Sequence, residues 1–435
     1  MASIVFIIIS GAVFFFAFKA FREVYQNIQL GKSFDSSGKP SERWRDVLLI
    51  AFGQKKMFDR PIAAFFHLFI YLAFLFTQVE LIEIFIDGIF GTHRFLAHYL
   101  GVFYDVIIGF IEVLSLLALV ATVIFLARRN LLRLPRFTKS ELLGWPQQDA
   151  NIILLGEILL VFGIFTMNGA DHLLQNLQPE HYPQVALPIS HITGPILFGG
   201  LDVSTLQIIE RLGWWQHVLV VFGFMIYLPY SKHLHIFLAF PNVYFRPERS
   251  RGEMENIPTI TAEVKSMFGL GPEPAVTDEI PVFGANDIFS LSKKNLLDAY
   301  TCTECGRCTS VCPANLTGKK LSPRKIMMDV RDRATEVGKK MRTSSKAEKS
   351  EPFSDGKSLF DYISREEIRA CTSCNACVEA CPVLINPLDI ILQLRRYEVL
   401  TESQTAEAWT PMFTSLENQG CVWQVPQERD AWIHS

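Results

Sequence analysis

The sequence predicts an all-α fold in which a five-span transmembrane helical bundle is followed by a helical domain built around two cysteine runs. Apolar runs long enough to cross a bilayer are confined to the part before residue 240, and eight of the nine cysteines lie in two evenly spaced runs after residue 300. Strand patterns are weak throughout. The formal net charge of −3 gives no indication of a nucleic acid partner, and we expect none.

The five predicted spans all lie within residues 1–240, which we expect to form a membrane domain. A span needs about 20 apolar residues, and several of these runs are flanked by the Trp, Tyr, Lys or Arg typical of membrane interfaces. The first run lacks the positively charged start of a signal peptide, so it is predicted to be an anchor. The predicted spans are residues 4–20, 61–85, 100–127, 151–168 and 214–231.

The charges of the connecting segments predict the orientation. Residues 19–60 contain nine Lys or Arg and residues 128–139 contain five, whereas residues 86–99 and 169–212 contain one each. By the positive-inside rule the basic connectors face the cytoplasm. We therefore expect a multi-pass protein of a prokaryotic cytoplasmic (inner) membrane, with its N-terminus outside and its C-terminal part in the cytoplasm.

The chain changes character after residue 240. Residues 241–292 are charged and rich in Pro and Gly, which is typical of a linker, and apolar residues within them indicate that the linker is docked. Helical patterns then surround the cysteine runs over residues 293–400. Residues 401–435 are expected to form a C-terminal tail.

The cysteine spacing is the most specific signal in the chain. Each run has the form Cys-x2-Cys-x2-Cys-x3-Cys-Pro, in which three thiolates hold one cubane cluster and the fourth holds the other. A zinc ribbon needs only four ligands and no Cys-Pro end, and a disulfide framework is typical of oxidising compartments. A ferredoxin-like domain with two [4Fe-4S] clusters is therefore predicted, with the metal ligands Cys302, Cys305, Cys308, Cys312, Cys371, Cys374, Cys377 and Cys381.

The fourth cysteine of each run is predicted to cross to the other cluster. Cys381 would then complete the set of Cys302, Cys305 and Cys308, while Cys312 would complete the set of the second run. Eight thiolate ligands agree with the reducing cytoplasm that the charge pattern predicts. Cys421 stands alone and is expected to be a small buried hydrophobe rather than a third redox group.

Histidines at the ends of the spans predict haem binding. A b-type haem can be held by two imidazoles from facing helices at one depth, and His67 and His235 meet that requirement near the cytoplasmic face. His217 and His235 are 18 residues apart, about five turns of a helix, so they are predicted to share a stripe at opposite faces, while His233 is predicted to point away from it. The cofactor-binding candidates are His67, His217, His233 and His235. The alternative is that these histidines hydrogen-bond to the backbone or cap helix ends.

A second haem would require a partner for His217 at the outer face. The corresponding position of the second span is Thr77, which is no haem ligand, whereas His98 and His172 lie near the right depth. One haem b is therefore predicted, and a second is left open.

Four protonatable groups near the outer surface are candidates for a quinone site, because quinone reduction couples electrons to protons. Each of them could equally be the solvated end of a helix. The four are Glu80, Glu83, Asp171 and His172.

Both halves of the chain resemble known families. The segment from Asn295 to Ala314, followed by Thr317-Gly-Lys and Ser322-Pro-Arg, resembles the iron–sulfur subunit of heterodisulfide reductases. The five-span part resembles the di-haem cytochrome b (gamma) subunit of respiratory nitrate reductase. The fusion, with Phe52-Gly-Gln-Lys-Lys-Met before the second span and Lys232-His-Leu-His-Ile after the fifth, is similar to the membrane-bound electron-transfer-flavoprotein:menaquinone reductase group.

The sequence departs from these families in two ways. Thr77 stands where their cytochrome carries a second haem histidine, and the sequence lacks their domain with paired Cys-Cys-Gly motifs. The resemblance therefore implies a partner subunit that carries this domain. An electron-transfer flavoprotein, a heterodisulfide-type thiol partner or an organic-acid dehydrogenase would all fit as the electron donor.

These features predict a membrane-bound oxidoreductase subunit of the respiratory chain, which relays electrons between a cytoplasmic partner, two clusters, haem b and the quinone pool. No catalytic residue is assigned, and Arg307, Arg324 and Lys325 are expected to offset cluster charge. The alternative is a redox sensor or assembly factor without haem or quinone chemistry. An ion pump is disfavoured because the spans are expected to lack a chain of deep carboxylates.

Overall fold

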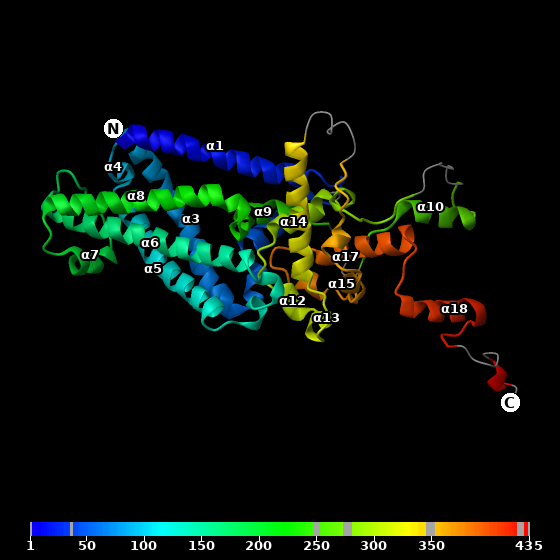
Figure 1. Cartoon of the computed structure of the whole chain (residues 1–435). Coiled ribbons are helices and arrows are strands. Elements are labelled where there is room, and N and C mark those ends of the chain that lie inside the picture. Colours follow the sequence, from blue (N-terminus) through cyan, green and yellow to red (C-terminus); the bar gives the residue numbers. More distant parts are fainter. Residues whose placement is uncertain are drawn as a thin grey trace.

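The computed structural model describes residues 2–34, 38–247, 253–272, 281–344, 353–423 and 430–433. Within these ranges every named element is a helix, and the one β-bridge is an isolated pair between Lys32 and Ser292. A bundle of long helices carries the cysteine-rich domain at one end (Figure 1). We call this end of the bundle proximal and the other end distal. The predicted all-α fold is confirmed.

Five helices are long and apolar enough to cross a membrane, which is consistent with a multi-pass membrane protein. The last two extend well beyond the predicted runs, because polar residues such as Asp171 and Glu210 continue the helix while they are buried against neighbouring helices. The five are α1 (Ala2–Ile28), α3 (Pro61–Phe90), α5 (Val102–Asn130), α6 (Trp145–Leu177) and α8 (Val203–Tyr227), whose 3-10 extension reaches Tyr230.

Small residues allow the membrane helices to pack closely. A Cβ atom at Gly163 of α6 would lie 3.0 Å from the backbone nitrogen of His217 in α8, and one at Gly213 would lie 2.5 Å from the backbone nitrogen of Met167. Helix association within membranes relies on such small residues, since it has no hydrophobic driving force. These glycines therefore set the separation of α6 and α8.

Shorter helices connect and flank the bundle. In the linker region α10 has no buried residue, whereas Ala285, Ile288 and Leu291 are fully buried, so the end of the linker is docked. The short helix α9, which follows the last membrane segment, also continues past residue 240. These helices are α2 (Pro40–Asp46), α4 (Phe95–Leu100), α7 (Ser190–Phe198), α9 (His235–Tyr244) and α10 (Pro258–Met267).

The helices of the cysteine-rich domain begin at side chains suited to capping. Ser292 and Asn295 form a reciprocal capping box at the start of α11, and Ser322 caps α14 with Pro323 at the first helical position. The sequence itself therefore marks where these helices start. They are α11 (Lys293–Thr301), α12 (Arg307–Val311), α13 (Pro313–Leu316), α14 (Pro323–Thr343), α15 (Arg365–Arg369), α16 (Ala376–Glu379), α17 (Pro387–Arg396) and α18 (Thr410–Gln419).

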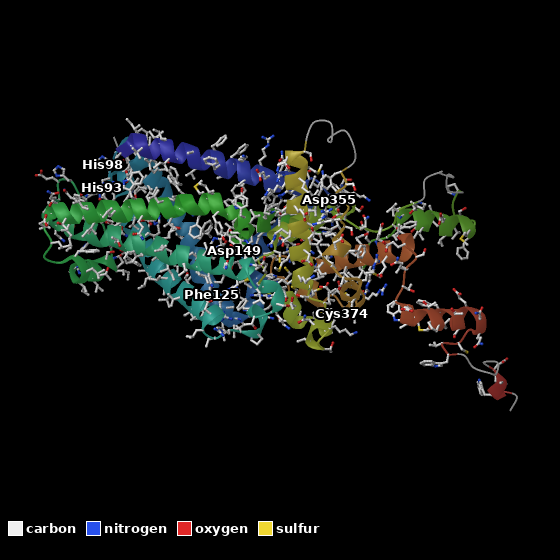
Figure 2. The ribbon with its side chains drawn as sticks, in the orientation of Figure 1. His93, His98, Phe125, Asp149, Asp355 and Cys374 are labelled. Atoms are coloured by element: carbon white, nitrogen blue, oxygen red, sulfur yellow. The ribbon has the colours of Figure 1, made fainter. Side chains whose placement is uncertain are left out.

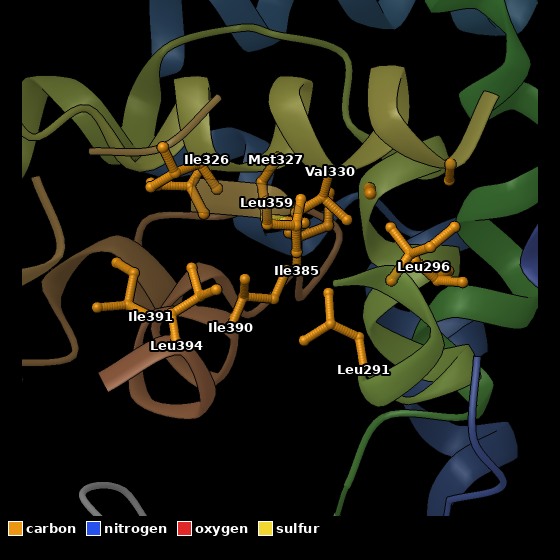
Figure 3. Packing of buried hydrophobic residues seen from close by; sticks show 14 of the residues in the cluster. Leu291, Leu296, Ile326, Met327, Val330, Leu359, Ile385, Ile390, Ile391 and Leu394 are labelled. Atoms are coloured by element: carbon orange, nitrogen blue, oxygen red, sulfur yellow. The ribbon is translucent and has the colours of Figure 1, made fainter. Parts of the chain in front are cut away.

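One hydrophobic core joins the cysteine-rich domain to the bundle. Val24 and Ile28 of α1 and Leu234 before α9 belong to the same buried cluster as residues of α11, α14 and α17. Figure 3 shows the domain side of this core, where Val330 of α14 packs near Ile390 of α17. The shared core shows that the domain is packed on the proximal end and not merely tethered to it. This packing stabilises the contact, since buried apolar surface contributes about 25 cal/mol per Å².

Lys294 makes a buried polar contact between the cysteine-rich domain and α9 at the proximal end of the bundle. Its ammonium lies 3.0 Å from the side-chain oxygen of Asn242 in α9 and 2.6 Å from the carboxylate of Asp298. None of the three residues is more than 4% exposed. The contact therefore depends on every member being paired, because a buried charge without a partner is destabilising.

We predict that Asp298→Ala lowers the free energy of unfolding by roughly 3–5 kcal/mol, because it leaves the Lys294 ammonium buried without its anion. Thermal unfolding of the full chain in detergent measures the change. Glu366→Ala is the control, since it removes only an exposed pair with Lys320 and should have little effect. Equal shifts for the two variants would contradict the importance of the buried contact.

Candidate metal centres and the distal polar network

The two cysteine loops share one backbone conformation. Glu304 and Gly306 in the first loop have φ values of 55° and 71°, and Ser373 and Asn375 in the second have 55° and 61°. These positions lie two and four residues after the first cysteine of each run. Left-handed residues reverse the chain sharply. Each loop therefore folds its first three cysteines into a small volume.

The electrostatic neighbours of the thiols fall into two groups. Cys381 interacts electrostatically with the first three cysteines of the first run. Cys312 likewise interacts with cysteines of the second run. Cys308 also interacts with Cys377, so the two sets are neighbours. The ligand assignment stays a prediction, but each fourth cysteine lies where the crossing needs it.

The surroundings of these thiols fit iron–sulfur clusters. Burial raises the pKa of Cys302, Cys377 and Cys381 to about 12, so the thiols stay neutral until a metal displaces their protons. The backbone N–H of Ile385 donates to the sulfur of Cys381 at 3.3 Å, a contact that stabilises negative sulfur. In the described ranges no three His, Cys, Asp or Glu side chains surround a single ion. A cubane instead gives each thiolate its own iron.

The three basic residues expected to offset cluster charge differ in their partners. Arg324 is fully buried and lies 2.7 Å from the carboxylate of Glu141, and Lys325 pairs with two acidic side chains. Arg307 donates to the backbone carbonyls of Lys56 and Met57 at 3.0 and 3.2 Å. Among the described residues Arg307 forms no ion pair, so of the three its charge is the most available to a cluster.

His67 and His235 have the hydrogen bonds expected of metal-binding imidazoles. Nδ1 of His235 lies 2.8 Å from the carbonyl oxygen of Lys232, and Nδ1 of His67 lies 3.2 Å from the side-chain oxygen of Gln54. In both rings Nε2 is left for another partner, which is the usual arrangement for a metal ligand. The two rings also interact electrostatically across the proximal end. This donor set fits a haem held between α3 and α9.

The single helix that was expected to carry His217 and His235 is interrupted. α8 ends at Tyr227, and two 3-10 turns precede α9, the first of which contains Pro229. Proline removes a backbone donor and clashes with the preceding turn, so it ends or bends a helix. The helical stripe predicted for the two histidines is therefore wrong, although both lie on the last membrane segment or directly after it.

The prediction that His233 points away from this site is also wrong. Its ring centroid lies 6.4 Å from that of His235, and its Nε2 lies 3.3 Å from the carboxylate of Glu157. Glu157 also accepts a hydrogen bond from Thr122 and interacts with His67. The break in the helix rotates His233 back toward the bundle. The proximal end therefore holds three imidazoles and a carboxylate.

His217 has no second imidazole beside it in the described part of the chain. Thr77 is half-buried and its hydroxyl donates to a backbone carbonyl of its own helix. His98 packs on a neighbouring tyrosine, and His172 hydrogen-bonds to His191 at 3.1 Å. The arrangement gives no support to a second haem.

The distal end contains a buried network around Arg94, which the sequence analysis missed. Its guanidinium lies 2.7 Å from Asp171 and 3.3 Å from the hydroxyl of Tyr104, which donates to Glu83 at 2.5 Å. Two of the four quinone candidates thus meet in one network. A third, Glu80, is 4% exposed and has a carboxylate oxygen without a partner. Arg94 is the single Lys or Arg of the connector 86–99, and this isolation was the signal available.

Buried acids are more frequent in the membrane helices than predicted. Glu112 of α5 is 1% exposed and accepts the backbone N–H of Ile189 at 2.8 Å. Asn168 joins Glu112 to Arg94, at 3.4 Å and 2.9 Å respectively. These are single acids with polar partners, which hydropathy averages over a span do not reveal; the expected lack of a chain of deep carboxylates stays a prediction.

A cavity of about 480 Å³ opens beside this network. Its lining includes His93, Arg94, His98, Tyr104 and His181. Figure 2 shows His93 and His98 at the distal end and Cys374 at the opposite side of the molecule. The protonatable groups and the cysteine sets are thus separated by the length of the membrane helices.

Comparison with known proteins gives matches for the cysteine-rich domain and for the longer chain. The family described as "4Fe-4S dicluster domain" matches residues 301–385. A probable iron-sulfur-binding oxidoreductase, FadF, of Bacillus subtilis is 30% identical over 93% of this chain and 57% of its own length. An EtfAB:quinone oxidoreductase of Syntrophomonas wolfei is 26% identical over 89% of this chain and 53% of its own.

A shorter match involves the cysteine-rich part. One subunit of a ferredoxin/F(420)H(2)-dependent CoB-CoM heterodisulfide reductase of Methanosarcina acetivorans is 32% identical over 26% of this chain and 55% of its own length. No solved structure gives a match. The chain spans little more than half the length of the two longer relatives. The chain is therefore similar to iron–sulfur oxidoreductases, and it contains a 4Fe-4S dicluster domain.

Proposed function

We propose that the chain relays electrons between a redox partner protein, two [4Fe-4S] clusters, one haem b and membrane quinone. The observation that carries this proposal is the continuity between the cysteine sets and the histidine site. The domain that holds the cysteines shares its core with the end of the bundle that holds His67 and His235. A protein of this kind acts by positioning its cofactors and tuning their potentials.

Different residues of the chain would hold the clusters and tune their potentials. Bound clusters supply one-electron carriers, and two of them match the two electrons that convert a quinone to a quinol. The crossed cysteine sets hold the carriers in one domain, and Arg307 places an uncompensated positive charge beside Cys305. Buried cations near a cluster favour its more negative, reduced state.

The distal cavity is the proposed quinone site. Reduction of a quinone takes up two protons, so the site needs donors that can be resupplied. Arg94 and Tyr104 line the cavity and connect it to Glu83 and Asp171, which are buried behind them. The network is thus placed to orient a quinone ring by hydrogen bonds and to carry protons to it.

The orientation and the partner are part of the same proposal. α1 begins at the distal end and its other end packs on the cysteine-rich domain, so an odd number of crossings separates the N-terminus from the clusters (Figure 1). With the basic connectors at the proximal end, we place this end in the cytoplasm of a prokaryote. A flavoprotein or a Cys-Cys-Gly subunit would then exchange electrons at the cysteine-rich domain.

The crossing makes a specific prediction about the clusters. Anaerobically purified chain should contain about eight irons, because each run contributes to two complete sets of four thiolates. Cys312→Ser should damage the cluster held mainly by the second run, and Cys381→Ser should damage the other. Iron analysis with EPR of the reduced protein distinguishes the two. Loss of the first-run cluster in Cys312→Ser would refute the crossing.

The histidine site makes a second prediction. His67→Ala and His235→Ala should each abolish the low-spin b-type absorption while the cluster EPR signals persist, because each removes one axial ligand. His172→Ala, at the distal end, is the matched control and should keep the haem. Absorption spectra and pyridine haemochrome analysis provide the readout. A haem that survives His235→Ala but is lost in His233→Ala would show that the wrong histidine was assigned.

A further inference from the structure

A second cavity lies at the proximal end, apart from the sites described so far. It has a volume of about 410 Å³ and is formed where α3 begins and α5 ends, with residues 134–136 beside it. Three of its lining side chains are guanidinium groups, those of Arg60, Arg128 and Arg136, and the other lining residues are Ala, Ile, Leu or Pro. No cysteine or histidine of the candidate metal centres lines it. Its occupant would therefore be distinct from the clusters and the haem.

The three arginines have no carboxylate partner within the described ranges. Arg60 donates to the hydroxyl of Ser310, Arg128 lies over a phenylalanine ring, and Nε of Arg136 is buried without a partner there. Arg60, Arg128 and Arg307 repel the charge of Arg136, and the thiol of Cys305 opposes this repulsion. Like charges held together in a region of low dielectric repel strongly, so the cluster is favoured when an anion neutralises it.

The position of the cavity indicates where that anion comes from. Ile62, which lines it, is 72% exposed, and Leu131, just after α5, is 79% exposed. Large apolar side chains exposed at the end of two spans face the acyl region of a bilayer, and arginines at the same level face the headgroups. Basic pockets between membrane helices bind phosphate headgroups of lipids, and guanidinium groups suit phosphate oxygens because they can bind two at once.

We propose that this cavity binds the phosphate headgroup of an anionic phospholipid, with the acyl chains against the exposed apolar side chains beside it. Two of the arginines also contact the cysteine-rich domain. Arg60 donates to Ser310 of α12 at 2.6 Å, and the backbone carbonyl of Arg136 accepts from Arg324 at 2.7 Å. A bound lipid would thus hold the domain against the membrane. This inference is independent of the proposed electron transfer.

Native mass spectrometry of the full chain in mild detergent tests the proposal, with phosphatidylglycerol and phosphatidylcholine as the added lipids. The wild type should retain phosphatidylglycerol in preference to phosphatidylcholine. Arg128→Gln and Arg136→Gln should each weaken this retention by about tenfold, because each removes a charged hydrogen bond to phosphate. Arg133→Gln is the control, since its side chain lies outside the cavity lining and donates to the carbonyl of Asn130.

Three results would overturn the proposal. Equal retention of the two lipids would show that the charge of the headgroup is not recognised. Equal retention by the wild type and both variants would show that the lipid binds elsewhere. Displacement of phosphatidylglycerol by inorganic phosphate alone would assign the cavity to a soluble anion. The comparison of the two lipids on the wild type keeps the test decisive even where a variant fails to fold.

Discussion

The position of the cysteine-rich domain against the membrane bundle depends on Lys232. Its ammonium lies 3.3 Å from Asp149 of α6 and 2.7 Å from Glu304 in the first cysteine loop, and its backbone carbonyl accepts Nδ1 of His235. One residue thus connects a membrane helix, a cluster loop and a haem-ligand candidate. Because the side chain is only 9% exposed, its charge must stay paired, and this requirement fixes the separation of the candidate centres.

The two ends of the bundle have different polar chemistry. The proximal end holds the cysteine sets, the haem-ligand candidates and several arginines, whereas the distal end holds carboxylates around Arg94 together with the histidines that line the cavity. Charged groups inside a membrane are stabilised only when they are paired or lie beside a cavity. Both ends meet this condition through contacts between helices, as with Asp171 and Arg94. Electrons that enter at the proximal end and protons that are supplied at the distal end would meet at the proposed quinone site.

Local patterns in the sequence predicted the parts that depend on local chemistry. The cysteine spacing predicted the 4Fe-4S dicluster domain, and the apolar runs predicted the five membrane helices. Neither prediction requires knowledge of contacts between residues far apart in the sequence, because cysteine spacing and span length are properties of short segments.

The features that the sequence analysis missed depend on tertiary contacts. Arg94 becomes buried because α4 packs on α3 and α5 while the Arg94 side chain binds Asp171 of α6. No periodic pattern in the sequence indicates this placement. The orientation of His233 was mistaken because an ideal helix was extended through Pro229, where the backbone departs from helical geometry. Single buried acids such as Glu112 are likewise visible only once their partners are known.

Oxidation of the pre-reduced chain by a soluble menaquinone analogue tests the central claim most directly. The purified chain would be reduced anaerobically and mixed with the quinone, while haem absorption and cluster EPR signals are followed. We expect both to be oxidised, with much slower oxidation in Arg94→Gln than in the control Arg211→Gln, whose exposed side chain lies outside the cavity lining. Reduced centres that do not respond to quinone, or equal rates for the two variants, would contradict the proposed relay.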